Sequence, residues 1–207
     1  MTCAKSHEIR SQKNQEGNII DVMDIFKQSG ALLQGHFRLT SGKHSAQYMQ
    51  CAQVLQYPHL AAQLGAELAK IWQGQGIETV IGPAMGGIIV AHEVAKALGV
   101  RSLFTERENG KMSLRRGFSL SAGEKVLVVE DVITTGGSVR EVLDVVRQLG
   151  ADPVGVGVLV DRSGGKEGFG VPLTSLLQLN IEAFEPDECR LCQESIPCIK
   201  PGSRVVE

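Results

Sequence analysis

A short, continuously apolar run is the feature that most limits the folds open to this chain. Residues 125–129 read Lys-Val-Leu-Val-Val and are followed by a loop of small residues. A second apolar run covers 154–160, and apolar residues in helical spacing lie between the two runs, at Val139, Val142, Leu143, Val146 and Leu149. Apolar runs without polar alternation are typical of parallel strands covered on both faces, and the connection between two such strands is almost always right-handed. The pattern therefore predicts a parallel sheet flanked by helices.

The same alternation of helix and strand precedes this unit. The expected elements are a helix from Pro58 to Gly74, a strand at 79–81, a helix at 88–98 and a strand at 102–105. Residues 106–118 are polar and basic and are expected to form a loop, and one or two short strands are expected beyond Ser175. The fold class is therefore α/β, with a Rossmann-like parallel sheet.

The first part of the chain differs in character from this unit. Residues 1–17 are polar and lack helical or strand periodicity, so we expect a mobile arm, and we expect residues 18–207 to form a single domain. Asn18 can cap a helix that ends near Gly30. Further on, two extended segments are expected at 36–40 and up to Tyr48, joined by a glycine turn at Ser41-Gly42-Lys43.

Charge and hydropathy exclude several classes of protein. The 21 Lys and Arg residues nearly balance the 23 Asp and Glu residues, for a net charge of −2, so no overall field attracts nucleic acid or an anionic membrane. The amino terminus has no apolar leader, and no run approaches the roughly 18 apolar residues that span a membrane. We therefore expect a cytoplasmic protein without nucleic-acid or membrane partners.

The five cysteines are odd in number and too sparse for a disulfide scaffold, so we expect them to be reduced. Cys189 and Cys192 form a Cys-x-x-Cys pair of the kind found in zinc sites, and Cys198 lies further on. The sequence shows no obvious fourth ligand. The expectation is therefore reduced structural thiols, no metal site made by protein side chains, and less than about one zinc per two chains on elemental analysis.

The segment after the central apolar run carries the strongest chemical signal. Glu130 and Asp131 stand at its end, and the loop that follows contains Thr134, Thr135, Gly136, Gly137 and Ser138. In open α/β sheets, ligands bind at this end of the strands. Glycine amides, hydroxyls and a helix N-terminus suit a phosphate monoester, while the acids suit sugar hydroxyls or a divalent metal ion. The combination predicts a site for a phosphorylated ribose, and the alternative is an ordinary capped turn beside solvated acids.

This strand, acidic pair and Thr/Gly/Ser loop resemble the phosphoribosyl pyrophosphate signature of the type I phosphoribosyltransferases. From about Ile19 to the tail, the chain is similar to the members of that family that use orotate. The resemblance implies the type I fold, with a small hood built from the N-terminal segment. It also implies an enzyme of pyrimidine biosynthesis that transfers the 5-phosphoribosyl group to orotate, giving orotidine 5'-monophosphate and pyrophosphate.

Two further segments bear on the identity of the base. Ser41, Gly42 and the later Ser45 resemble the Ser-Gly-x-x-Ser segment with which orotate-using members hold the base, and Tyr48 can lie against a planar ring. Thr40 stands where many relatives have a lysine. The resemblance makes Arg162 the partner of the orotate carboxylate, a group that guanidinium binds in a planar, bidentate manner. The structural alternatives are a plain hairpin turn and a surface ion pair of this arginine.

The residues Gly-Pro-Ala-Met-Gly-Gly at 82–87 are similar to the family's pyrophosphate loop. The resemblance implies that backbone amides of Ala84, Met85 and Gly86 contact the diphosphate. Relatives often have an aromatic residue and a lysine at the last two of these positions, so the lysine contact is missing here. A simple strand-to-helix turn is the alternative.

The basic segment 106–118 resembles the loop that, in this family, closes over the active site of a neighbouring subunit. The resemblance implies that Arg107 and a catalytic Lys111 act on the leaving pyrophosphate. Ser113 stands where a histidine is usual in the family. A solvated basic face is the structural alternative.

The implied chemistry requires charge stabilisation on both sides of the breaking bond. Lys111, Arg107 and Mg²⁺ would neutralise the departing diphosphate, while Glu130 and Asp131 would hold the ribose hydroxyls and favour a cationic ring. Mg²⁺ is expected to be held mainly by the pyrophosphate and ribose of the substrate, and the resemblance implies a homodimer. The competing hypotheses are a phosphoribosyltransferase for another base and a regulatory protein that retains the phosphoribosyl pyrophosphate site.

Overall fold

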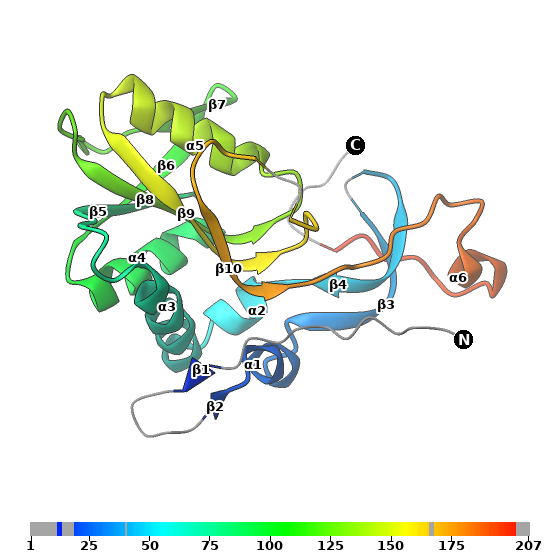
Figure 1. Ribbon diagram of the computed structural model, residues 1–207. Helices are drawn as coiled ribbons and strands as arrows, with labels where there is room; N and C mark the ends of the chain where they lie inside the picture. The colour runs from blue at the N-terminus through cyan, green and yellow to red at the C-terminus, as the bar shows by residue number, and fades with distance from the viewer. Residues whose placement is uncertain (1–11, 14–18, 40, 166–167, 202–207) are drawn as a thin grey trace, which may run out of the picture.

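The computed structural model describes residues 12–13, 19–39, 41–165 and 168–201. Its centre is a six-stranded sheet in the order β10-β9-β8-β5-β6-β7, in which only β7 runs antiparallel to its neighbour (Figure 1). The strands are β5 (Thr79–Pro83), β6 (Arg101–Glu108), β7 (Lys111–Leu114), β8 (Lys125–Ile133), β9 (Asp152–Asp161) and β10 (Leu173–Gln178). The expected α/β class and parallel sheet are therefore confirmed.

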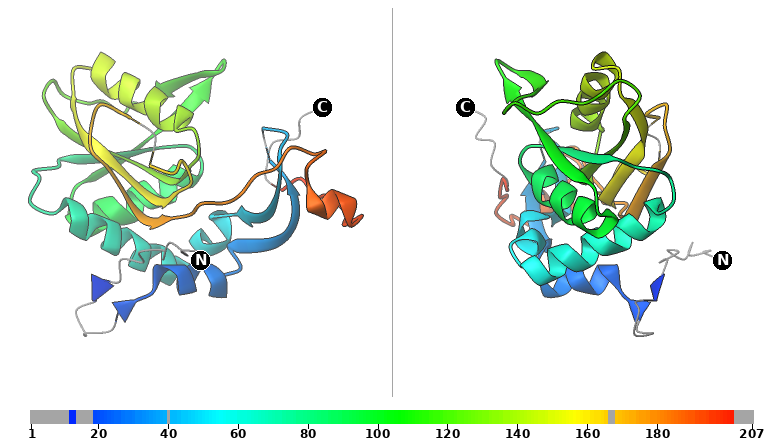
Figure 2. Two further views of the ribbon diagram at one scale, coloured as in Figure 1. Left: turned by 45° about the vertical axis from the view of Figure 1, so that its right-hand side comes forward. Right: turned by 90° about the vertical axis from the view of Figure 1, so that its left-hand side faces the viewer.

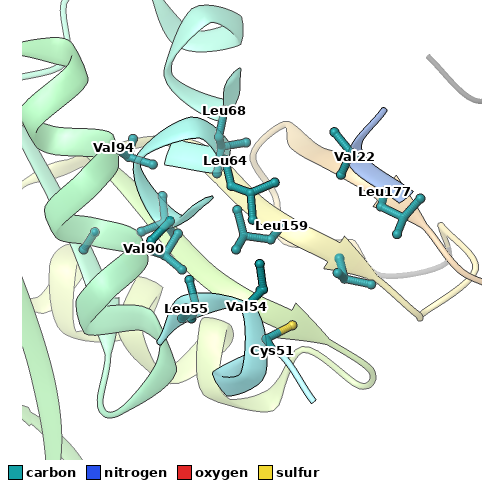
Figure 3. Close-up of a cluster of buried hydrophobic side chains, with 14 of the residues drawn as sticks. Val22, Cys51, Val54, Leu55, Leu64, Leu68, Val90, Val94, Leu159 and Leu177 are labelled. Atoms are coloured by element: carbon teal, nitrogen blue, oxygen red, sulfur yellow. The ribbon is translucent and has the colours of Figure 1, made fainter. Parts of the chain in front are cut away.

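Helices cover both faces of the sheet because its central strands are apolar on both sides. Leu127 and Val129 of β8 belong to a cluster with α3 (Pro58–Trp72) and α4 (Gly86–Leu98). Figure 3 shows side chains of both helices in this cluster. Val126 and Val128 point the other way, into a cluster with α5 (Gly137–Gln148). Successive strand residues point to opposite faces, so one uninterrupted apolar run supplies both cores.

A small hood stands apart from the sheet (Figure 2). It consists of the antiparallel strands β3 (Leu32–Arg38) and β4 (His44–Met49), against which a C-terminal segment with the short helix α6 (Arg190–Gln193) is laid. His44 and Phe184 exchange backbone hydrogen bonds of 2.8 Å in both directions, and Ile199 bonds both His36 and Arg38 at 2.8 Å. The hood thus joins segments some 150 positions apart in the sequence.

The N-terminal helix was predicted to begin too early. Ile19–Ile20 form strand β2 instead, which pairs with β1 (Gln12–Lys13). Helix α1 (Val22–Gln28) begins later than expected and is capped by Asp21, whose carboxylate accepts from the amide of Met23 at 2.9 Å. Asn18, the expected cap, and the rest of the expected arm lie outside the described residues.

Two other regions differ from the expectation. The segment expected to be a loop at 106–118 contains a hairpin, because β6 continues to Glu108 and β7 returns beside it. Asn109 and Gly110 at its turn have φ values of 50° and 80°, the left-handed conformation that an Asn-Gly hairpin turn favours. A short helix, α2 (Ala52–Leu55), also precedes α3 and had not been expected.

Across the described part of the chain, we find no helix that is both long and apolar enough to cross a membrane.

Candidate active site

Several of the expected site residues lie at one edge of the sheet, because three neighbouring parallel strands end there. Strand β5 leads into the loop before α4, β8 carries the acidic pair, and β9 is followed directly by Arg162. This edge faces the side on which the hood lies (Figure 1). Parallel α/β sheets bind ligands at this end of their strands, so the topology alone defines a candidate site.

Glu130 and Asp131 lie within the last part of β8, which continues to Ile133 because its pairing with β9 extends to Asp161. Glu130 is 9% exposed, and its carboxylate accepts a hydrogen bond of 3.1 Å from the Asp131 amide. Burial, reinforced by the negative charge of Asp131, raises the pKa of Glu130 well above its ordinary value, and burial also raises the pKa of Asp131. Two adjacent, poorly solvated carboxylates therefore favour a ligand that brings positive charge or hydroxyl donors.

The loop at 82–87 lies directly against this acidic pair. A Cβ added to Gly86 would meet the carboxyl carbon of Asp131 at 2.6 Å, and one added to Gly87 would lie 3.2 Å from Oε1 of Glu130. Only glycine permits the first turn of α4 to come so close to the carboxylates. Ala84 precedes this turn, and the side chain of Met85 is 80% exposed. The structure therefore brings the expected pyrophosphate loop and the acidic pair together.

The expected phosphate loop leads from β8 into α5. Thr134, Thr135 and Gly137 are exposed, and Ser138 is partly so. Gly136 caps α5 with a left-handed backbone, φ 66°. The open backbone and hydroxyl groups at a helix N-terminus suit a phosphate group.

Phe169 is a residue of this loop region that sequence reasoning missed. A Cβ on Gly136 would meet the Phe169 ring at 2.6 Å, and the Arg140 guanidinium lies 5.1 Å from the ring centre. Arg140 also donates a 2.5 Å hydrogen bond to the carbonyl of Thr135. Phe169 and Arg140 therefore both pack against the loop. No local pattern marks Phe169, because its ring comes from beyond β9, more than thirty positions from Gly136 in the chain.

Arg162 lies at the end of β9, partly buried, and its backbone amide bonds the carbonyl of Ile133 at 2.9 Å. Its Nε is buried and has no hydrogen-bond partner among the residues described. Within that same part of the chain, no ion pair joins it to Asp161, whose carboxylate instead accepts from the amide and hydroxyl of Ser163 at 2.7 and 2.6 Å. The structure therefore does not have the ion pair between Arg162 and Asp161 that was the structural alternative for this arginine. Burial lowers the pKa of Arg162, so its donors face a poorly solvated space.

Tyr48 reaches this space from β4 of the hood. Burial raises the pKa of the Tyr48 phenol, while the nearby Arg162 guanidinium opposes that rise. Cys51, the residue before α2, is also close to this region, with its thiol 3.8 Å from the carbonyl of Asp131. Burial, together with the charges of Asp131 and Glu130, raises the pKa of Cys51 well above its ordinary value. Cys51 is a second residue that sequence reasoning missed, since a lone buried cysteine carries no motif.

The Ser41-Gly42 turn connects the two strands of the hood. Gly42 has φ 86° and donates to the carbonyl of Leu39 at 3.0 Å, while the exposed Lys43 pairs with Glu185 at 2.8 Å. These bonds stay within the hood, so the structure forms the expected turn without joining it to the sheet. Thr40 lies outside the described residues.

The basic residues of the β6–β7 hairpin are not gathered with the acidic pair. Arg107 pairs with Glu141 of α5 at 2.7 Å, and Arg115 and Arg116 pair with glutamates of β6. Lys111 is exposed, and no ion pair engages its ammonium within the described ranges. In the described residues, the acidic pair, the loop after β8 and Arg162 therefore lie at one edge of the sheet, whereas the hairpin arginines are engaged in ion pairs with glutamates.

Comparison with known proteins agrees with this arrangement. The family model described as the phosphoribosyl transferase domain matches residues 51–168. Orotate phosphoribosyltransferase of Desulforamulus reducens is 64% identical over 90% of this chain and 97% of its own, and that of Thermotoga maritima is 54% identical over 88% and 98%. The crystal structure of orotate phosphoribosyltransferase from Aeropyrum pernix has a TM-score of 0.65 at 30% identity, covering 76% of this chain and 93% of that one.

The chain therefore belongs to the phosphoribosyltransferases and has their type I fold. Within that family, the extent of its identity to the relatives above places it among the orotate phosphoribosyltransferases.

Proposed function

We propose that this chain transfers the 5-phosphoribosyl group from phosphoribosyl pyrophosphate to orotate, releasing orotidine 5'-monophosphate and pyrophosphate in pyrimidine biosynthesis. The observation that supports the proposal is the position of Arg162 at the end of β9, the strand that pairs with β8 and its acidic pair. The Arg162 guanidinium is partly buried, and its Nε has no hydrogen-bond partner among the described residues. Orotate differs from uracil by a carboxylate, and guanidinium is the side chain best suited to bind that group in a poorly solvated site.

The substrate's sugar and phosphate are assigned to β8 and the loop after it. Glu130 and Asp131 bind the ribose hydroxyls, and their negative charge favours the oxocarbenium-like ring as the glycosidic bond to pyrophosphate breaks. Thr134, Thr135, Gly136, Gly137 and Ser138 hold the 5'-phosphate at the N-terminus of α5.

The base is assigned to the side of the site nearest the hood. Arg162 binds the carboxylate of orotate, Tyr48 packs on the pyrimidine ring, and the Ser41-Gly42 turn orients it. Orotate is already acidic at its ring nitrogen, so these residues act by positioning and no side-chain nucleophile is needed.

The leaving pyrophosphate is assigned to the backbone amides of Ala84, Met85 and Gly86, at the start of α4, and to basic side chains. Lys111 and Arg107 supply those charges. Because Lys111 lies exposed next to the turn of the β6–β7 hairpin, without an ion pair among the described residues, we propose a homodimer in which this hairpin serves the partner's site. Arg107 must then exchange its bond to Glu141 for one to the substrate.

Magnesium fits this donor set. Carboxylate oxygens are ligands that Mg²⁺ prefers, and the raised pKa of Glu130 beside Asp131 marks negative charge that a divalent cation would offset. Most of its ligands would come from the pyrophosphate and ribose of the substrate, with these two carboxylates nearby. When bound, Mg²⁺ neutralises charge that develops on the leaving group.

A panel of bases tests the proposal. Orotate, uracil, hypoxanthine and adenine are each supplied with phosphoribosyl pyrophosphate and Mg²⁺, and nucleotide and pyrophosphate are quantified. We expect turnover of orotate alone, in equal amounts of the two products, and its loss when Mg²⁺ is chelated. Turnover of uracil or a purine without orotate would reject the proposed substrate.

A further inference from the structure

Four metal-ligating side chains meet where the hood contacts the C-terminal segment. His36 comes from β3, His44 begins β4, Cys189 precedes α6 and Cys192 lies within it. One nitrogen or sulfur atom of each lies within 4.8 Å of those of the other three. The sequence shows only the Cys-x-x-Cys half of this group, because the two histidines precede it by about 150 positions. Folding therefore supplies the ligands that the sequence analysis did not find.

The spacing of these atoms matches the ligand shell of one small ion. Nε2 of His36 lies 3.6 Å from Sγ of Cys189 and 3.7 Å from Sγ of Cys192. Nδ1 of His44 lies 2.9 Å from Nε2 of His36 and 3.2 Å from Sγ of Cys192. Zinc–nitrogen and zinc–sulfur bond lengths give tetrahedral edges of about 3.4 Å between nitrogens and about 3.6 Å between nitrogen and sulfur. These four distances agree with those edges to within about half an ångström, and the two remaining pairs lie within 4.8 Å.

The surroundings of His36 fix which of its nitrogens faces the group. Its Nδ1 lies 2.7 Å from the carbonyl oxygen of Ile196, which can only accept a hydrogen bond. Nδ1 therefore carries the proton and Nε2 presents its lone pair to the other three side chains. A backbone carbonyl in this position is the usual outer partner of a histidine that binds a metal.

Burial and donor chemistry distinguish the kind of metal site. Cys189 is 0% exposed, His36 2% and His44 8%, and of the four only Cys192 lies toward solvent. Two imidazoles and two thiols, without a carboxylate, suit Zn²⁺ and not Mg²⁺ or Ca²⁺. Structural zinc sites have this closed, four-ligand composition.

We propose that His36, His44, Cys189 and Cys192 bind one structural zinc ion, with both cysteines as thiolates. The ion fastens the C-terminal segment to the hood hairpin and adds to the backbone bonds of Phe184 and Ile199. The two histidines flank the Ser41-Gly42 turn, so the ion would also fix the base of that turn. This proposal replaces the expectation, drawn from sequence, of reduced thiols without stoichiometric zinc.

Cys198 provides a matched control. Its Sγ lies 3.9 Å from Nε2 of His44, on the side of the ring opposite the nitrogen that faces the group, and it is exposed. It does not belong to the four ligands. Cys192, which is only partly buried, is the ligand whose replacement disturbs packing least.

The test measures metal content and needs no activity assay. The full chain is purified without chelator, and zinc is quantified by elemental analysis in the wild type, Cys192→Ser and Cys198→Ser. We expect about one zinc per chain in the wild type and in Cys198→Ser, and at least a several-fold loss in Cys192→Ser. Wild-type protein with little zinc, and none taken up on titration with ZnCl₂, would overturn the proposal. Equal loss from both variants would overturn the ligand assignment.

If Cys192→Ser does not fold, cobalt substitution of the wild-type protein tests whether two thiolates bind the metal ion. Wild-type protein is stripped of metal and titrated with Co²⁺ alone. Strong tetrahedral d–d bands with thiolate-to-cobalt charge transfer, saturating at one equivalent and removed by Zn²⁺, are expected. A weak octahedral spectrum without charge transfer would contradict a site with two thiolates.

Discussion

Gly86 lies so close to Asp131 that a Cβ added to the glycine would meet the carboxyl carbon of the aspartate at 2.6 Å. The start of α4 and the end of β8 therefore form one surface, with backbone amides on one side and carboxylates on the other. A ligand that carries both a diphosphate and ribose hydroxyls matches these two sides.

The first prediction concerns this contact. Gly86→Ala must displace either the Asp131 carboxylate or the first turn of α4, and misplacement of a catalytic group by about 1 Å can cost on the order of 100-fold in rate. We expect that loss in kcat/KM, with a stability cost of about 1–3 kcal/mol from overpacking. Gly168→Ala is the control, because its added methyl would meet nothing within 4 Å. Activity of Gly86→Ala close to wild type would show that the contact is not needed.

The second prediction concerns pH and Glu130. Its pKa is raised in the folded chain, so the folded state keeps a proton that the unfolded state has lost, and stability falls as pH rises from the ordinary carboxyl value through the raised one. Glu130→Gln removes this cost. We expect the variant to be more stable than wild type by about 1–3 kcal/mol above this pH range, with little difference below it.

Urea unfolding at fixed protein concentration between pH 4 and pH 9, upward from the ordinary carboxyl value, measures the effect. Asp144→Asn, which removes an exposed carboxylate of α5, should keep the wild-type pH dependence. A stability difference for Glu130→Gln that does not change with pH would contradict the account.

The third prediction concerns the homodimer. Asp131→Asn and Lys111→Ala should each fold and lose most activity, because one removes charge aimed at the ribose and the other charge aimed at the leaving group. When the two inactive variants are mixed and subunits exchange, half of the dimers are mixed, and each carries one site with both residues intact. Activity should recover to about a quarter of wild type.

The control for this experiment is a measurement of exchange itself, with differently tagged chains. No recovery despite proven exchange would mean that Lys111 does not serve the partner's site. If Lys111→Ala is fully active by itself, the residue has no catalytic part.

The central strands of the sheet could be predicted from the sequence, because the pattern that marks each strand lies within the strand itself. An apolar run such as 125–129 indicates a strand buried on both faces, and the acidic pair that follows is placed by the same run. The extension of β8 to Ile133 was not predictable, since it depends on pairing with β9 up to Asp161. Similarly, Asn and Asp are both residue types that favour the start of a helix, so the sequence could not choose between positions 18 and 21, and the pairing of Ile19–Ile20 with β1 leaves the start to Asp21.

Contacts between distant segments explain what sequence reasoning missed. Phe169 reaches the phosphate loop from beyond β9, and Cys51 enters the site from the start of α2. His36 and His44 come together across the hood hairpin, with ring centres 4.8 Å apart, and meet Cys189 only because the C-terminal segment pairs with that hairpin. No spacing rule links such positions. The Asn109-Gly110 turn is different, because its two residues were a local hairpin signal.

The most direct test of the account is the effect of Arg162 on the two substrates measured separately. In Arg162→Ala the orotate carboxylate loses its bidentate partner, a loss of about 2–5 kcal/mol for a buried charge pair. That loss corresponds to a rise in the KM for orotate of about 30-fold or more, while we expect the KM for phosphoribosyl pyrophosphate to stay near the wild-type value. In Arg162→Lys, which keeps the charge but not the bidentate geometry, we expect a KM for orotate between those of the wild type and Arg162→Ala. Equal changes in both KM values, or an unchanged KM for orotate, would contradict the assignment of Arg162 to the base.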